Sequence, residues 1–308
     1  MIGQTRGKPI LVTGSNRSGT TWVGRTIALS RSVGYMNEAF NLSFYDYESP
    51  HKSHIPIQHR YTYITRDNEA QYLDFVQQTL RFQLDYRIRP TRLPVKLQRF
   101  VYATTYRLFR YPRPLLKDPL AAVASEWLAK TFDLDVVVMV RHPAAYVSSL
   151  KRLGWGFDFG NFLNQPQLMQ DWLQPFSAEL QNPPQELVDR GALLWMCLYH
   201  VLDGFIQRNP GWTVKQHEEV SAAPVEQFRD IYQRLNIPFT GNIINRIERE
   251  TSSANPVDAP GNVTHHLQRD SRALVKSWQK SLTEGEITRI RQKTEPLASR
   301  FYADDDWI

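Results

Sequence analysis

Residue types that bind or transfer an anionic group gather in one short stretch near the start of the chain, GSNRSGTTW at positions 14–22. Gly14 and Gly19 have the spacing of a phosphate-binding loop, GxxxxG, and Arg17 places a positive charge inside it. In such a loop the backbone N–H groups and the start of the next helix point toward one place, where they bind a phosphate or sulfate. The two threonines that follow Gly19 add hydroxyl donors. We therefore expect an anion-binding loop rather than a turn that binds nothing.

The loop differs from the nucleoside-triphosphate signature at one position, and this difference indicates which ligand it binds. That signature requires a lysine directly after the second glycine, and Thr20 stands there instead. An ATP-dependent kinase of the P-loop type is therefore less favoured, although Arg17 could supply charge. A kinase and a non-catalytic nucleotide- or polyanion-binding module both remain as alternatives.

Three further charged residues follow predicted strands. Glu38 ends the stretch VGYMNE, Lys117 ends PLLK, and Arg141 follows the apolar run VVVMV. Because ligands of parallel sheets bind beyond the carboxyl ends of the strands, these side chains are expected to face the same crevice as the loop. A surface carboxylate and a surface lysine are the alternative interpretations of Glu38 and Lys117.

The elements that position these residues alternate between strand and helix. The run ILVT at 10–13 predicts a strand, positions 19–29 a helix, 33–40 a second strand, and 121–132 and 190–207 further helices. Strand, helix and strand in succession form a right-handed βαβ unit. WTVKQ at 212–216 predicts another strand and 224–235 another helix.

Two motifs carry a resemblance to a known family. RSGTTW at 17–22 resembles the 5′-phosphosulfate loop of sulfotransferases that use PAPS (3′-phosphoadenosine 5′-phosphosulfate). DVVVMVRHPAAYVSSLKR at 135–152 is similar to the family's 3′-phosphate segment, in which an arginine and a serine eight residues later bind that group, here Arg141 and Ser149. The resemblance covers about two thirds of the chain and implies a P-loop α/β fold with a central parallel sheet and helices on both faces.

The resemblance also implies a reaction and its residues. A sulfuryl group passes from PAPS to an acceptor hydroxyl or amine, PAP is the product, and no metal is needed. Glu38 is the expected base, and Lys117 and Arg17 the expected stabilisers of developing charge. The nucleotide is expected to bind to Arg17, Ser18, Gly19, Thr20, Thr21, Trp22, Arg141 and Ser149, with Arg272 or Lys276 meeting the 3′-phosphate. His200 and His265 are alternative bases, although His200 sits in an apolar helix pattern.

The acceptor is expected to meet a mainly helical insertion at 43–113, which interrupts the sheet pattern within one domain of residues 1–308. Positions 87–113 hold eight lysines or arginines, interleaved aromatic residues and no acidic residue. A solvated face and contact with an anionic acceptor or a membrane surface remain open, and no nucleic-acid partner is expected. The stretch favours a carbohydrate or glycolipid acceptor over a small phenol.

The sequence also predicts the structure of three other segments. Positions 154–187, rich in Gly, Asn, Gln and Pro, predict a flap or cap, and 251–270 predict a loop that covers the nucleotide. The terminal DDDWI is expected to be a solvated tail.

Composition sets the remaining bounds. The 308 residues carry a formal charge of +6, which favours anionic ligands. The single cysteine, Cys197, can form no internal disulfide and indicates a reducing compartment. No apolar run approaches the roughly 18 residues that would span a bilayer. We expect a cytoplasmic enzyme of the bacterial, carbohydrate-directed type, with no prediction of its oligomeric state.

Overall fold

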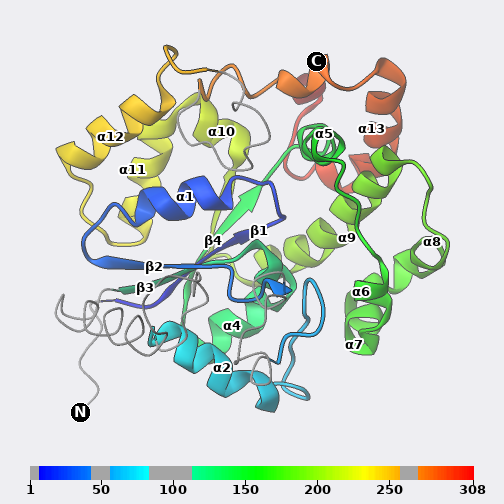
Figure 1. Cartoon of the computed structure of the whole chain (residues 1–308), viewed down its shortest axis with the longest axis horizontal. Helices are drawn as coiled ribbons and strands as arrows, with labels where there is room; N and C mark the ends of the chain where they lie inside the picture. Colours follow the sequence, from blue (N-terminus) through cyan, green and yellow to red (C-terminus); the bar gives the residue numbers. More distant parts are fainter. Residues whose placement is uncertain (1–6, 43–55, 83–112, 257–269) are drawn as a thin grey trace, which may run out of the picture.

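A parallel sheet lies at the centre of the computed structural model, which describes residues 7–42, 56–82, 113–256 and 270–308 (Figure 1). Within these residues five strands pair in the order β2 (Val33–Asn37), β3 (Arg113–Lys117), β1 (Ile10–Gly14), β4 (Asp135–Val140) and β5 (Thr213–Gln216). Every pair is parallel. Lys117 lies opposite Asn37 on one side and Val12 on the other, so neighbouring strands end at the same edge. The predicted strands and the parallel α/β class are confirmed.

Both faces of the sheet are buried. Ile10, Val12 and Met139 belong to one apolar cluster, and their neighbours along the strands, Leu11 and Val138, belong to a second. Successive strand residues point to opposite faces, so each cluster covers one face. This explains why the strands are nearly continuous apolar runs instead of alternating patterns.

Different helices cover the two faces, as Figure 1 shows. One face carries α1 (Thr20–Ile27), α10 (His217–Ala222), α11 (Pro224–Arg234) and α12 (Gly241–Thr251). The other cluster includes α2 (Ala70–Leu80), α4 (Ser125–Phe132), α5 (Pro143–Leu153), α9 (Leu187–Arg208) and α13 (Glu284–Ala298). Within the described residues, no helix combines the length and apolar composition needed to cross a bilayer.

Two elements differ from the sequence-based expectation. The stretch predicted as one helix over 121–132 is a 3₁₀ helix, η3 (Pro119–Ala124), followed by α4. The carboxylate of Asp118 caps η3 by accepting from the N–H of Leu120, and Pro119 starts it, so helical structure begins earlier than apolar spacing predicts. Between the strand and the helix predicted at 212–216 and 224–235, the chain also forms α10.

The segment predicted to be a flap is largely helical. It contains α6 (Gly160–Leu163), α7 (Pro166–Leu168), a π turn η4 (Met169–Leu173), a 3₁₀ turn η5 (Gln174–Phe176) and α8 (Ser177–Gln181). Phe162, Leu168 and Leu173 are at most 1% exposed and join the larger apolar cluster. The segment is thus packed onto the domain, and its role as a cap over the site stays a prediction.

The expectation of a solvated tail at the C-terminal end is wrong. The last residues form a 3₁₀ helix, η7 (Asp304–Trp307), and the Trp307 side chain is 7% exposed. Trp307 packs edge-on against the ring of His142 at 4.3 Å, and Trp278 of η6 (Ser277–Lys280) stacks on that ring at 5.3 Å. The three aspartates before Trp307 stay exposed, so the short helix buries the apolar ring and keeps the charges in water.

His142 is the centre of this packing and is 1% exposed. Neither ring nitrogen has a hydrogen-bond partner within the described residues, and Tyr302 closes a further side at 4.9 Å. Burial and the nearby Arg141 charge lower the pKa of His142 to about 3. The aromatic surroundings therefore favour the neutral imidazole, and protonation of the ring at low pH destabilises the folded protein.

We expect His142→Phe to make the protein less acid-sensitive. A histidine pKa lowered by folding contributes stability that is complete above the unfolded pKa of about 6.5 and disappears as the pH falls toward 3. Between pH 7.5 and pH 5 the original protein should lose about 2 kcal/mol more unfolding free energy than the variant. Urea denaturation at a series of pH values measures the difference, and parallel pH curves would contradict the prediction.

Candidate active site

The predicted anion-binding loop joins β1 to α1 in a closed turn. The hydroxyl of Ser18 donates to the carbonyl of Ser15 at 2.6 Å, and its backbone N–H donates to the same oxygen at 3.2 Å. Three residues of the loop have positive φ angles, Gly14 at 137°, Arg17 at 67° and Gly19 at 89°. The turn leads directly into the first N–H groups of α1, as an oxyanion site requires.

Close packing explains both glycines. A Cβ at Gly14 would lie 2.2 Å from the carbonyl oxygen of Met139 on β4, and one at Gly19 would lie 2.5 Å from Cδ2 of His217. The loop is therefore pressed against the ends of the neighbouring strands. His217 begins α10 and lies next to Trp22, with ring centroids 6.3 Å apart. No pattern near Gly19 indicates this contact, because His217 lies 198 positions later in the sequence.

Tyr199 of α9 forms hydrogen bonds to the loop. Its hydroxyl lies 2.9 Å from the Ser15 hydroxyl and accepts from the backbone N–H of Arg141 at 3.1 Å. One side chain thus joins the end of β1 to the end of β4. Burial raises the pKa of Tyr199 to about 12, so the phenol stays protonated at neutral pH.

Asn16 is held by two tyrosines from different parts of the chain. The hydroxyls of Tyr61 and Tyr146 each donate to its Oδ1 at 2.9 Å. Tyr61 belongs to the segment before α2, and Gln165 accepts the N–H of Tyr63 at 2.8 Å and donates to the Tyr61 carbonyl at 3.0 Å. The segment before α2 and the residues predicted as a cap are thereby bonded to the predicted anion-binding loop.

Glu38 and Lys117, predicted from the two strand ends, form an ion pair. The ammonium of Lys117 donates to Oε1 of Glu38, and the Asn41 side chain donates to Oε2 at 2.6 Å. The side chains are 1% exposed for Lys117 and 15% for Glu38. Burial lowers the pKa of Lys117, and the adjacent carboxylate opposes that effect. The pair can present an ionised carboxylate and an ammonium to the same small volume.

Asp118 supports this pair and was not predicted. Its buried carboxylate accepts from the N–H of Phe40 at 2.6 Å and from the N–H of Leu120 at 2.9 Å. It thereby fixes the turn that carries Glu38, whose φ angle is 51°. Burial and the negative charge of Glu38 raise the pKa of Asp118 to about 7. The Asp-Pro pair, a helix-start signal, could have indicated the cap but not this second bond.

The loop and the predicted 3′-phosphate segment meet directly. Nε of Arg17 donates to the Ser149 hydroxyl at 3.0 Å, and Arg141 donates to the carbonyl of Arg17. Nε of Arg141 is buried and has no hydrogen-bond partner within the described residues. Burial lowers the pKa of Arg141, with Glu218 opposing the shift. Buried donors of this kind are normally paired, so an oxyanion at this place would complete the arginine's bonding.

In the described part of the chain, Arg272, Lys276 and His200 contact other partners. Arg272 is exposed and donates to the carbonyl of Ala222 at 3.1 Å, and the exposed Lys276 donates to the carbonyl of Ile308. His200 packs against Phe176, with ring centroids 5.3 Å apart. His265 lies outside the described residues, so no contact of it enters the site.

One member of the basic stretch at 87–113 has a structural role. Arg113 is 4% exposed, donates to the Leu235 carbonyl at 2.5 Å and pairs with Asp135. Arg113 is therefore neither a solvated cation nor a contact for the sulfate acceptor, because its N–H groups are bonded to partners inside the protein. The other basic residues of that stretch lie outside the described residues.

The chain belongs to the sulfotransferase family. A sulfotransferase family match covers residues 9–194, which include the loop, Glu38, Lys117, Arg141 and Ser149. The protein is accordingly a sulfotransferase enzyme. No curated protein sequence matches the chain.

Solved structures of sulfotransferases resemble the chain over nearly its whole length. A sulfotransferase domain from the curacin biosynthetic pathway is 12% identical, with a TM-score of 0.52 over 94% of this chain and 98% of that one. A sulfotransferase domain from the Synechococcus PCC 7002 olefin synthase is 14% identical, with a TM-score of 0.49 over 97% of both chains. The curacin-pathway domain has the same fold as this chain.

Gly14→Ala should strongly destabilise the protein. The new Cβ would overlap the Met139 carbonyl, and a φ of 137° is unfavourable for alanine. Backbone strain of this kind costs about 1–3 kcal/mol before the overlap is counted, so we expect a loss of about 3 kcal/mol in urea denaturation.

Gly156→Ala is the matched control. A Cβ at Gly156 would have no atom within 4 Å, and its φ angle is not positive. That variant should unfold within about 0.5 kcal/mol of the original protein. Equal stability of the Gly14 and Gly156 variants would show that the loop is not pressed against β4 as described.

Proposed function

We propose that the protein transfers a sulfuryl group from PAPS to a hydroxyl or amine of an acceptor by in-line displacement. The observation that carries the proposal is that Arg17 of the loop bonds to both Ser149 and Arg141. The Glu38–Lys117 pair lies where β2 and β3 end, along the same edge of the sheet from which β1 enters the loop. Family membership supports PAPS as the donor. Thr20, where a nucleoside-triphosphate site has lysine, also favours this donor over ATP.

Glu38 is the proposed general base. It accepts the acceptor's proton as the acceptor oxygen or nitrogen bonds to sulfur, while the bond between sulfur and the 5′-phosphate oxygen breaks. The ammonium of Lys117 pairs with the Glu38 carboxylate and holds it in position. Asn41, bonded to Oε2, orients the carboxylate.

Cations and N–H groups of the loop are the proposed stabilisers of the departing group. Lys117 and Arg17 neutralise charge on the sulfuryl oxygens and on the leaving phosphate, and the N–H groups from Ser18 and Gly19 onward donate to that phosphate. The hydroxyls of Thr20 and Thr21 complete its hydrogen bonds. Because the surrounding groups already fix the loop, little reorganisation is needed during transfer.

Arg141 and Ser149 are the proposed 3′-phosphate residues, and Trp22 the proposed adenine contact. The unpartnered Nε of Arg141 and the Ser149 hydroxyl, already next to Arg17, support this assignment. Arg272 and Lys276 are candidates for closing on the same phosphate, together with the 251–270 loop. This 3′-phosphate distinguishes the donor from ATP.

The acceptor is proposed to be a carbohydrate or glycolipid. The support is the interleaving of cations and aromatic residues at 87–112, within the proposed acceptor-side insertion 43–113 of a single domain. Peripheral membrane contact through the same stretch would suit a lipid-linked acceptor. The unpaired, buried Cys197 supports a reducing compartment, and we therefore propose a cytoplasmic location.

PAP should stabilise the protein far more than ADP with Mg²⁺ does. A ligand that binds only the folded state at one hundred times its dissociation constant adds about 2.7 kcal/mol, which thermal-shift titration measures readily. Ser149→Ala should weaken the PAP effect and leave the small ADP effect unchanged. Equal stabilisation by PAP and ADP would contradict PAPS as the donor and favour a kinase.

Glu38→Gln should retain PAP binding and lose transfer. Glutamine preserves the shape and can accept from Lys117, but it cannot take up the acceptor proton at neutral pH. We expect at least about a hundredfold loss of sulfate transfer from labelled PAPS, measured on a panel of saccharides, glycolipids and phenols.

Glu219→Gln is the control for this variant, because Glu219 is an exposed carboxylate on α10. Its activity should equal that of the original protein. Full activity of Glu38→Gln would overturn the assignment and direct attention to His200 or His265 as the base.

A further inference from the structure

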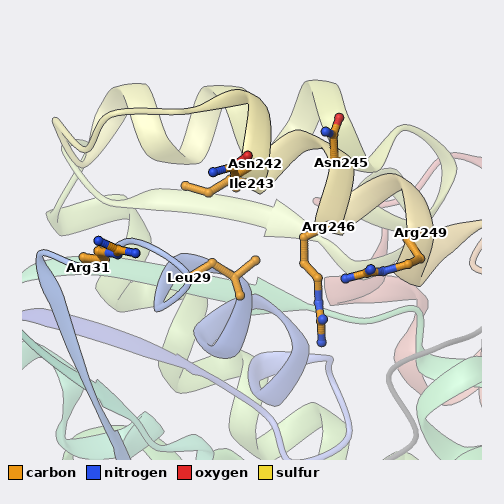
Figure 2. A pocket seen from close by; sticks show the side chains of 7 residues that line it. All are labelled: Leu29, Arg31, Asn242, Ile243, Asn245, Arg246 and Arg249. Carbon is orange, nitrogen blue, oxygen red and sulfur yellow. The ribbon is translucent and has the colours of Figure 1, made fainter.

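A pocket outside the proposed active site lies between the end of α1 and the helix α12 (Figure 2). Its volume is about 440 Å³, within the range of small-molecule sites. The lining side chains come from two segments more than 200 residues apart in sequence, and they are Leu29, Arg31, Asn242, Ile243, Asn245, Arg246 and Arg249.

The helix α12 presents two distinct stripes. Ile243 and Ile247 are at most 6% exposed and pack into the apolar cluster under the helix. Asn242, Asn245 and Arg249, at spacings of three and four residues, are exposed beside that stripe and line the pocket. The packing of the isoleucines thus determines which polar side chains of α12 face Leu29 and Arg31.

Positive charge around the pocket exceeds negative charge. Arg246 pairs with the buried Glu250 at 2.5 Å. Within the described residues, no carboxylate lies within salt-bridge distance of Arg31 or Arg249. Two of the three guanidinium groups that line the pocket therefore lack such a partner among the described residues, while Glu248 is one further exposed carboxylate on α12.

The pocket is separate from the anion-binding loop. The loop precedes Thr20 at the start of α1, whereas Leu29 and Arg31 follow its end. Eight helical residues span about 12 Å, so one phosphate cannot contact both places.

We propose that this pocket binds a small ligand carrying at least two oxyanion groups, either phosphates or sulfate esters. Guanidinium groups match the geometry of such oxygens and bind them with paired hydrogen bonds, and the Asn242 and Asn245 side chains add amide donors. Leu29, 38% exposed, offers apolar surface for the uncharged part of the ligand. The proposal does not depend on the PAPS-dependent function.

Calorimetric titration with sodium pyrophosphate tests the site. Because the anion-binding loop can also bind this probe, the titration is made on Arg17→Ala as well as on the original protein. Binding should persist in Arg17→Ala and weaken about tenfold in Arg31→Ala and in Arg249→Ala, since each removes a charged donor. Binding should also weaken as salt is raised.

Arg234→Ala is the matched control, an exposed arginine on α11 that pairs with Asp230 outside the pocket. It should leave pyrophosphate binding unchanged. A second titrant, a disulfated disaccharide, distinguishes sulfate esters from phosphates as the preferred ligand. Thermal-shift titration with PAP should give the original result in Arg31→Ala and Arg249→Ala.

Two results would overturn the proposal. One is the absence of pyrophosphate and disaccharide binding at millimolar concentration. The other is binding that is lost in Arg17→Ala but kept in both pocket variants, which would place the anion at the loop alone. A failure of PAP to bind, with pyrophosphate still dependent on Arg31 and Arg249, would instead contradict only the proposed donor.

Discussion

The contact between Lys117 and Glu38 is the constraint on which the site depends. An ammonium that is 1% exposed is stable inside a protein only when a counter-charge offsets the cost of removing it from water. Glu38 supplies that charge, and its N–H donates to the Lys117 carbonyl at 2.8 Å, which ties the end of β2 to the end of β3. The buried carboxylate of Asp118 holds the turn from the other side. The candidate base therefore has its position because the strands pair in parallel and end together.

The loop is held in the same way, by bonds from distant parts of the chain. Tyr199 joins it to the end of β4, and Tyr61 and Tyr146 hold Asn16. Burial raises the pKa of each tyrosine, so each hydroxyl stays protonated at neutral pH and can donate a hydrogen bond. Groups oriented before the ligand arrives stabilise developing charge most effectively. Tyr61 also connects the loop to the segment before α2 and, through Gln165, to the residues predicted as a cap, so the three share one hydrogen-bond network.

Arginine has three different roles in this chain, and surroundings decide among them. Arg113 is buried with Asp135 and carbonyl partners and stabilises the side of the sheet where the strands begin. Arg141 is buried with a donor left over, an arrangement suited to a bound oxyanion. Arg31 and Arg249 are exposed around a pocket. Arginine therefore stabilises the structure in one place and lines two proposed anion-binding regions in others.

Local sequence was enough to determine the class of fold and to propose the residues of the candidate site. The apolar runs at 10–13 and 136–140, the GxxxxG spacing, and charged residues at strand ends are all short-range patterns, and they predicted the parallel sheet, Glu38, Lys117 and Arg141. Burial of Trp307 against His142, the second bond of Asp118, the place of His217 at Gly19, and the pocket under α12 were decided only by the tertiary structure. The physical reason is that each of these depends on contacts between residues far apart in sequence, and hydrophobic periodicity carries no information about which surfaces of two elements meet.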